Sequence, residues 1–245
     1  MKRTLYFENY YKTHFGKAHP DPEKELKSAA VEYSKFYRPF LPSDKDSKIL
    51  DIGCGTGHFL YTLMRMGYKN FEGIDLAADN IELVQKMIGG KVYLADVFNF
   101  LPLRKNLYDL IHSRDVIEHI PKNKIIDFLQ LIYQSLKPGG EIIIGTSNAV
   151  GPSPVALQSR YMDFTHEITF TEFSLEQILK IAGFQEIVII PTELKFKDLS
   201  FKGKIHYIIF KKTDYFFRRL YLRLTGIRPL PKVLHWHMTA IAQKP

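Results

Sequence analysis

Residues 48–60 combine an acidic side chain with three alternating glycines, a pattern suited to holding a small ligand. A short apolar run predicts a buried strand that ends near Asp51, and a helix is expected from about His58. The glycines between them can adopt positive φ and let the backbone approach a ligand closely; they are Gly53, Gly55 and Gly57. Unpaired N–H groups at the helix start would attract a carboxylate or phosphate. The segment predicts a cofactor-binding turn, and a strained turn that binds nothing is the alternative.

The glycine spacing separates two cofactor classes. A dinucleotide fingerprint needs a glycine at position 58, which His58 occupies, so the spacing argues against a nicotinamide oxidoreductase. The order D-x-G-x-G-x-G instead resembles the first motif of class I S-adenosylmethionine-dependent methyltransferases. The resemblance implies that the turn, including Cys54, touches the methionine end of the cofactor, with Asp51 close by.

Acidic residues after the next two predicted strands fit the same cofactor. Asp75 lies 24 residues after Asp51, where an open α/β sheet places the carboxylate that binds ribose hydroxyls, and Leu76 follows it. After the third strand, the resemblance implies that Asp96 receives the adenine amino group and that Val97 lies against the adenine ring. Capping of a helix or turn is the alternative role for Asp96.

The fourth predicted strand leads into a polar block that resembles the region beside the reaction centre in this family. Ser113, at the strand end, is expected next to the cofactor. Asp115, Glu118 and His119 stand at i, i+3 and i+4, so they would share one face of a helix. Ubiquinone-pathway O-methyltransferases are similar here and use E-x-x-E-H with a divalent ion, so these three residues are the candidate ligands if any metal binds. A helix start whose acids complement its dipole is the alternative.

Two further blocks complete the resemblance. L-K-P-G-G precedes the fifth strand, and D-F-T-H-E-I-T-F-T looks like a segment of methyltransferases from glycan and lipid-linked sugar pathways. In that segment Asp163 and His166 would orient a substrate hydroxyl and take its proton. His119 and His166 are therefore the candidate general bases. The alternative for His166 is a loop histidine that only satisfies backbone groups.

The alternation of strands and helices over residues 48–146 predicts a parallel, doubly wound α/β sheet with its ligand at the carboxyl ends of the strands. The resemblance implies a Rossmann-like, seven-stranded, mostly parallel sheet whose last strand, expected at 234–241, is antiparallel. We expect one domain over 1–245, comprising an N-terminal arm and helix at 1–42, a cofactor-binding core at 48–146 and an insertion at 192–232 between the last two strands. Outside the core, helices are predicted at 23–37, 174–182 (capped by Ser174 with Gln177) and 214–226 (capped by Asp214).

The composition limits the class of protein. With 245 residues, 45% of them hydrophobic, the chain can bury a sizeable core. No run approaches 18 apolar residues and the N-terminus lacks the apolar stretch of a secretory leader, so a cytoplasmic protein is expected. Cys54 is the only cysteine, which excludes an intrachain disulfide and fits a reducing compartment.

The net charge of +8 is concentrated in one late segment. Residues 195–232 carry eleven Lys or Arg against two acidic residues, a local balance of +9, so the remainder sums to −1. The same segment is rich in aromatic residues. This composition fits contact with a membrane surface carrying anionic lipid, RNA binding less well, or a solvated helix that caps the core.

These patterns predict an S-adenosylmethionine-dependent methyltransferase, and more narrowly an O-methyltransferase acting on a small-molecule, glycan or lipid-linked acceptor. The alternatives are an RNA methyltransferase and a non-catalytic cofactor-binding module that docks to membrane or RNA. The sequence leaves the acceptor, the methylated atom and the oligomeric state open.

Overall fold

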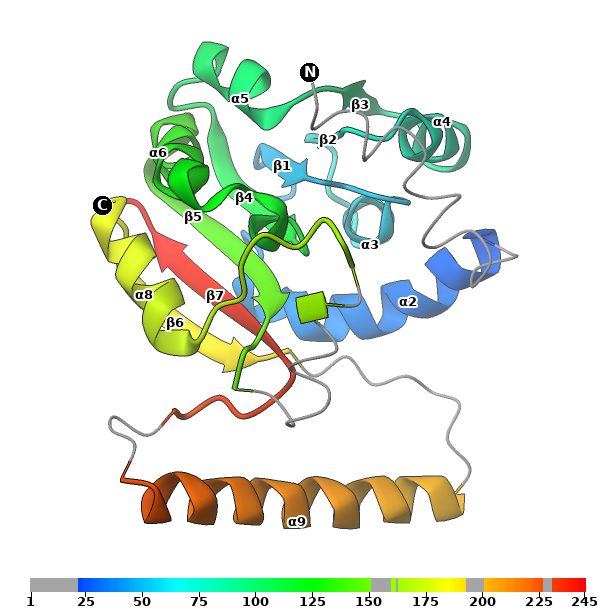
Figure 1. Ribbon diagram of the computed structural model, residues 1–245. Coiled ribbons are helices and arrows are strands. Elements are labelled where there is room, and N and C mark those ends of the chain that lie inside the picture. The colour runs from blue at the N-terminus through cyan, green and yellow to red at the C-terminus, as the bar shows by residue number, and fades with distance from the viewer. Residues whose placement is uncertain (1–21, 151–159, 162, 193–200, 227–230) are drawn as a thin grey trace.

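The computed structural model describes residues 22–150, 160–161, 163–192, 201–226 and 231–245, and it centres on a seven-stranded sheet (Figure 1). The strand order is β3-β2-β1-β4-β5-β7-β6. The chain therefore winds outward from β1 to β3, crosses back to β4 and continues to the other edge. This confirms the predicted doubly wound sheet, while the predicted N-terminal arm lies outside the described residues.

Six strands run in one direction and β7 runs against its two neighbours. β7 pairs antiparallel with β5 on one side and with β6 on the other, as the resemblance implied. The central strands β1 and β4 are largely buried, and their apolar residues are interrupted by the buried polar side chains of Asp51, His112 and Ser113. The strands are β1 Ile49–Ile52, β2 Phe71–Asp75, β3 Lys91–Leu94, β4 Tyr108–Arg114, β5 Leu136–Ser147, β6 Gln185–Pro191 and β7 His237–Gln243.

Helices cover both faces of the sheet. On one face α2 and α3 pack over Ile49 and Leu110, and α4 joins α3 through Leu60 and Val84. On the other face α5, α6 and α8 share one large core with alternate strand residues such as Leu50. The α-helices are α2 Pro22–Tyr37, α3 His58–Arg65, α4 Ala78–Met87, α5 Val97–Phe100, α6 Ile125–Ser135, α8 Glu172–Ile181 and α9 Phe201–Leu224. Short 3-10 turns are η2 Arg38–Phe40, η3 Leu101–Leu103, η4 Ile117–His119 and η5 Lys122–Lys124.

Two predicted helix caps are wrong. α8 begins two residues before Ser174, because the Thr171 hydroxyl accepts the Ser174 N–H at 3.2 Å while the Ser174 hydroxyl accepts the Thr171 N–H at 2.9 Å. This reciprocal pair is a capping box one turn earlier than predicted. α9 begins at Phe201, so Asp214 lies inside a longer helix and does not start it.

The last strand also starts later than predicted. The Asn148 side-chain amide donates hydrogen bonds of 2.9 Å to the carbonyls of Val233 and His235. These two carbonyls therefore bind a side chain and not a neighbouring strand. β7 consequently begins at His237. Among the described residues, no helix combines the length and the apolar content needed to cross a membrane.

A buried polar network ties α2 to the two central strands. Asp51 and His112 are neighbours in the β1–β4 register, and the His112 Nδ1 lies 2.7 Å from an Asp51 carboxylate oxygen. The other ring nitrogen of His112 lies 3.1 Å from the Tyr37 hydroxyl, and the Phe59 ring stacks on the imidazole. The sheet thus buries a carboxylate by giving it a charged or hydrogen-bonding partner.

Removing the imidazole should leave the Asp51 carboxylate buried without its partner. We expect His112→Ala to lower the free energy of unfolding by about 3 kcal/mol, measured by urea denaturation. Tyr37→Phe, which deletes only the outer hydrogen bond, should lose about 1 kcal/mol. Adding Asp51→Asn to His112→Ala should recover part of the loss, because a neutral amide is less costly to leave buried. No recovery would show that the loss comes from the cavity and not from the carboxylate.

Candidate active site

The predicted site residues gather where the winding direction of the sheet reverses. The carboxyl ends of β1 and β4 lie side by side there, because Ile52 pairs with Ser113. The turn after β1 and the segment after β4 therefore flank the same crevice, which is the usual ligand position in open α/β sheets.

The turn after β1 requires its glycines. Gly53, Gly55 and Gly57 have φ of 69°, 51° and 89°, in the left-handed region that other residues rarely adopt. A Cβ on Gly53 would lie 2.3 Å from a Val116 methyl group, and one on Gly57 would lie 2.7 Å from Ile88. At Gly55 no atom lies within 4 Å of the same position. The space beside Gly53 and Gly57 is therefore filled by packing, whereas the space beside the Cα of Gly55 is open to a ligand.

Asp75, the last residue of β2, binds the backbone of this turn. One carboxylate oxygen accepts the Gly55 N–H at 2.9 Å, and the other accepts the Ala77 N–H at 2.8 Å and the Asn80 amide at 3.3 Å. Burial raises the pKa of Asp75, and these hydrogen bonds act against that rise. The carboxylate is thus fixed at the end of β2, with Leu76 half-buried beside it.

Cys54 serves packing within the turn. It is buried, and its sulfur lies 3.1 Å from where a Cβ on Gly73 would stand. Burial and the nearby Asp75 carboxylate raise the pKa of the thiol well above its ordinary value, so the thiol stays protonated. The Asp51 carboxylate, two residues before the turn, is hydrogen-bonded to His112.

Asp96 has the capping role that was the alternative for it. Its carboxylate accepts the Phe98 N–H at 2.9 Å and so begins α5. Val97, the first residue of α5, is buried. Both residues stand after β3, so the cap fixes the backbone at the point where the adenine contact is predicted.

Two buried polar atoms among the described residues lack a hydrogen-bond partner in this region. They are the Ser113 hydroxyl, at the end of β4, and the Asn80 amide oxygen, beside Asp75. Such atoms are rare in folded proteins because desolvation without a partner is unfavourable. A ligand with hydroxyl or amino groups would supply partners, so the residues present fit a polar adenosyl cofactor.

The segment after β4 differs from the predicted helix. Asp115 has a φ of 55° and precedes a 3-10 turn, η4, so Asp115, Glu118 and His119 do not share a helix face. The Asp115 carboxylate instead lies 2.6 Å from the His237 Nε2 and 3.2 Å from the Arg114 Nε. Burial alone would raise the pKa of Asp115, but the His237 imidazole and the Arg114 guanidinium hold the pKa below its ordinary value. The predicted metal set is therefore not assembled: its three side chains turn to three different partners.

Glu118 is buried and uncharged at neutral pH. Burial raises its pKa to about 8, and the Asp115 carboxylate adds to the rise. Its side chain accepts a 3.0 Å hydrogen bond from the Thr146 hydroxyl on β5. Its backbone carbonyl accepts the N–H groups of Glu167 at 2.8 Å and Ile168 at 3.3 Å, which joins the post-β4 segment to the loop before α8.

His119 is held in one orientation by that loop. Its Nδ1 lies 2.8 Å from the Thr165 hydroxyl, which itself donates to the Asp163 carboxylate at 2.7 Å. Since the hydroxyl proton goes to Asp163, the Thr165 oxygen accepts from His119, and Nδ1 must carry the imidazole proton. Burial lowers the pKa of His119 to about 4, and His166 contributes to the decrease. The neutral imidazole therefore presents an unprotonated Nε2.

His166 joins the same cluster, so the two predicted bases come together. The ring centroids of His119 and His166 are 4.7 Å apart with an edge-on contact. The ligand atoms of His119, Asp163 and His166 all lie within 4.8 Å of one another. Arg160 donates to the carbonyls of His166 and Glu167, which holds the backbone of the loop. The cluster therefore brings two imidazoles and one carboxylate together, and a metal would find its donors here and not in the predicted set.

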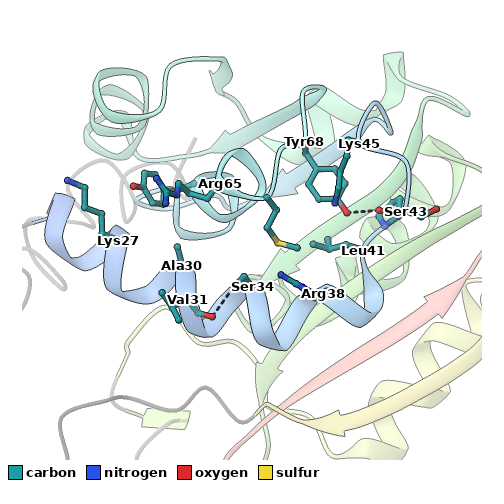
Figure 2. Close-up of a pocket in the computed structure, with 13 residues that line it drawn as sticks. Lys27, Ala30, Val31, Ser34, Arg38, Leu41, Ser43, Lys45, Arg65 and Tyr68 are labelled. Carbon is teal, nitrogen blue, oxygen red and sulfur yellow. Dashed lines mark hydrogen bonds between the residues drawn. The ribbon is translucent and has the colours of Figure 1, made fainter.

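A separate groove of about 950 Å³ lies between α2 and α3 (Figure 2). None of the predicted cofactor or catalytic residues lines it. Four cations do, and none of the described residues lining it is acidic; the cations are Lys27, Arg38, Lys45 and Arg65. Tyr61 and Tyr68 also line the groove, and the Lys45 ammonium lies 3.8 Å from the Tyr68 ring centroid.

Two contributors to the site were missing from the sequence prediction. Thr165 lies between two residues that were singled out, and its place in T-H could have suggested a partner for a histidine. His237 follows Asp115 by 122 residues in the chain, and no local pattern connects them. Only the antiparallel pairing of β7 with β5 brings this imidazole to the end of β4.

Comparison with known proteins gives a family. The family described as "Methyltransferase domain" matches residues 25–188. The rat "Ubiquinone biosynthesis O-methyltransferase, mitochondrial" is 35% identical over 109 residues, covering 41% of this chain and 31% of that protein. The Cellvibrio japonicus "tRNA U34 carboxymethyltransferase" is 31% identical over 114 residues, covering 44% of this chain and 35% of that protein. The match thus spans about a third of the length of these two relatives.

Solved structures share the fold. A crystal structure described as a SAM-dependent methyltransferase from Archaeoglobus fulgidus superposes with a TM-score of 0.65 at 22% identity. The superposition covers 91% of this chain and 97% of that one. At this identity the likeness concerns the fold alone.

The protonated state of Glu118 predicts a specific pH dependence of stability. The folded protein keeps a proton up to a pH of about 8 that the unfolded chain releases near an ordinary glutamate pKa of about 4.3. Because the native state binds more protons between these values, its stability should fall as the pH rises through them. Glu118→Gln stays neutral, so it should be more stable than the wild type at alkaline pH by about 1 kcal/mol or more, in urea unfolding.

A matched control for this comparison is Glu176→Gln, because Glu176 is a partly exposed glutamate on α8 whose partner is the surface side chain of Lys180. It should follow the wild-type pH profile. Parallel profiles for the wild type and Glu118→Gln would mean that Glu118 is ionised in the folded protein.

Proposed function

Because the chain belongs to the family of class I S-adenosylmethionine-dependent methyltransferases, we propose that it methylates a hydroxyl oxygen on a small-molecule, glycan or lipid-linked acceptor. The observation that carries the proposal is the neutral His119, oriented by Thr165 and Asp163 at the carboxyl edge of the sheet. A hydroxyl group must lose its proton to become a strong nucleophile, and a positioned neutral imidazole supplies the base. The family match sets the nicotinamide alternative aside.

In this proposal the cofactor lies along the edge from β1 to β3. The open space beside Gly55 and the helix start at His58 would hold its methionine end, supported by Asp51, Gly53, Cys54 and Gly57. Asp75 and Leu76 would contact the ribose, and Asp96 with Val97 the adenine. Ser113 would donate its unpaired hydroxyl to the cofactor. When bound, S-adenosylmethionine supplies an electrophilic methyl group.

The chain's own residues then handle the acceptor proton. His119 accepts this proton at Nε2, while the proton on Nδ1 stays hydrogen-bonded to the Thr165 hydroxyl oxygen. The imidazolium so formed is stabilised by the Asp163 carboxylate through the Thr165 hydroxyl. His166, in contact with His119, orients the acceptor hydroxyl or passes the proton on to solvent from its half-buried position. The proposed reaction needs no metal ion.

An RNA acceptor is the second candidate, and the groove between α2 and α3 favours it. Four cations and two tyrosines are suited to a phosphate backbone and to base stacking. One of the relatives reported above is named for a tRNA nucleotide. None of the proposed reaction-centre residues lines the groove, so the groove would hold a distal part of an RNA. RNA binding that is strongly salt-dependent and is lost in Arg38→Glu/Arg65→Glu would favour this candidate.

A non-catalytic module that binds the cofactor but methylates nothing is the third. Transfer of label from methyl-tritiated S-adenosylmethionine into extracts, fractionated into glycan, polyprenyl lipid and RNA, separates the three candidates. Label in the glycan or lipid fraction supports the hydroxyl acceptor proposed here. Label in RNA supports the second candidate, and no label in any fraction supports the module.

The glycine turn gives a direct test of cofactor placement. Gly55→Ala and Gly67→Ala both replace a glycine with positive φ and no neighbour within 4 Å of the new Cβ. Each variant should lose about 1 kcal/mol of stability from backbone strain. Only Gly55→Ala should also lose affinity for S-adenosylmethionine, by roughly tenfold or more in calorimetry. Equal affinities in the two variants would place the cofactor elsewhere.

The base assignment predicts a graded series in turnover. His119→Ala should lower kcat by about a hundredfold or more at neutral pH, with affinity for S-adenosylmethionine unchanged. Thr165→Val removes only the hydroxyl that orients the ring, so it should lower kcat by about tenfold. Alkaline pH should partly restore His119→Ala, because hydroxide then replaces the base. Activity equal to the wild type in His119→Ala would rule out this role.

A further inference from the structure

The helix α9 carries large apolar side chains that nothing in the described chain covers. It spans 24 residues between β6 and β7, and Figure 1 shows it lying apart from the sheet and its flanking helices. No α9 side chain whose exposure is described is buried, and Phe217 and Leu224 are 63% and 77% exposed. The other exposed apolar side chains are Ile209, Tyr215, Phe216, Leu220 and Tyr221. Exposed apolar surface on this scale marks an interaction site.

Most of these side chains form one stripe. Phe216 and Phe217 each precede Leu220 by four or three residues, and Leu224 follows Leu220 by four, so these side chains point to the same side of the helix. Tyr221 borders them. An internal core would bury such a stripe, as α6 does with its own apolar face. On α9 the described residues leave the stripe exposed, so its partner is external.

The charge of the helix restricts what that partner can be. Within α9 seven Lys or Arg accompany one acidic residue, Asp214, for a net charge of +6. Lys212 and Arg223 are exposed, and the Arg219 guanidinium donates to the Tyr215 hydroxyl at 2.7 Å, beside the stripe. A cation-rich helix with an apolar stripe matches a surface that is negatively charged outside and apolar beneath.

Other occupants fit less well. A second copy would place two +6 helices against each other, which like-charge repulsion disfavours. RNA would use the cations and aromatic rings, but the aliphatic Leu220 and Leu224 offer a base no stacking surface. The cations within the helix also argue against a spanning orientation, in agreement with the absence of a membrane-spanning helix among the described residues.

We propose that α9 docks the protein on an anionic lipid bilayer, lying in the plane of the interface. The stripe of Phe216, Phe217, Leu220 and Leu224 enters the boundary between headgroups and acyl chains, and the arginines and lysines contact phosphate and carboxylate headgroups. The segment 192–232 is then a docking insertion in the catalytic domain. Its consequence for the acceptor rests on the proposed function, because a surface-bound enzyme meets a lipid-linked hydroxyl acceptor in two dimensions.

Vesicle flotation of the full chain tests this docking. With vesicles of phosphatidylcholine containing roughly 30% phosphatidylglycerol, the wild type should float, and with pure phosphatidylcholine it should remain largely unbound. Phe217→Ser/Leu220→Ser should reduce the bound fraction at least fivefold. The matched control is Leu103→Ser, which removes an 86% exposed leucine on η3 and should bind as the wild type does.

Calorimetry with S-adenosylmethionine on the same proteins separates this inference from the proposed function. Retained cofactor affinity in Phe217→Ser/Leu220→Ser shows that the variant is folded, and its loss of flotation then supports docking through α9. The inference is overturned if that variant floats as the wild type does, if the wild type binds no anionic vesicles, or if the stripe instead mediates dimerisation or RNA binding. A wild type that floats but binds no S-adenosylmethionine would contradict the proposed function and leave the docking inference standing.

Discussion

The hydrogen bond between Asp51 and His112 joins β1 and β4 at the point where the chain reverses its winding across the sheet. Both side chains are buried, so each depends on the other for a polar partner. The glycine turn begins two residues after Asp51, and Ser113 directly follows His112. The same contact therefore fixes both walls of the crevice in which a ligand of this fold lies. Tyr37, the last residue of α2, extends the network to that helix.

The acceptor side of the crevice is organised by opposite effects on neighbouring titratable groups. Burial keeps Glu118 protonated, whereas His237 and Arg114 keep Asp115 ionised. His119 stays neutral because it is buried. Environments that push neighbouring pKa values apart are typical of sites that move protons. The backbone of Glu118 also anchors the loop carrying Asp163, Thr165 and His166, so the pieces of the proposed base are held by one another.

Local patterns were sufficient for much of this account. Buried runs and the glycine turn predicted the sheet and its ligand edge, because strand burial and positive φ leave marks within a few residues. The antiparallel last strand followed from the family resemblance. The pairing of His119 with His166 was anticipated only as two separate candidates. Their contact depends on backbone hydrogen bonds between the post-β4 segment and a loop some 50 residues later.

The failures came from contacts between distant residues. The spacing of Asp115, Glu118 and His119 fits a helix, but the backbone of Asp115 is left-handed and no α-helix forms there. The Asp115 carboxylate instead contacts His237 and Arg114. The partner of Asp51 likewise has no local signal, because its carboxylate is hydrogen-bonded to an imidazole 61 residues later in the chain. At α9, the helical period was visible in the sequence, but whether the stripe caps the core or faces outward required the fold.

The placement of the cofactor along the β1–β3 edge is tested most directly by amide hydrogen exchange with and without S-adenosylmethionine. The account predicts slower exchange on cofactor addition at the amides of 53–58, 75–77 and 96–98, with residues of the α2–α3 groove unchanged. Protection confined to that groove, or no protection at the glycine turn despite saturating cofactor, would contradict it.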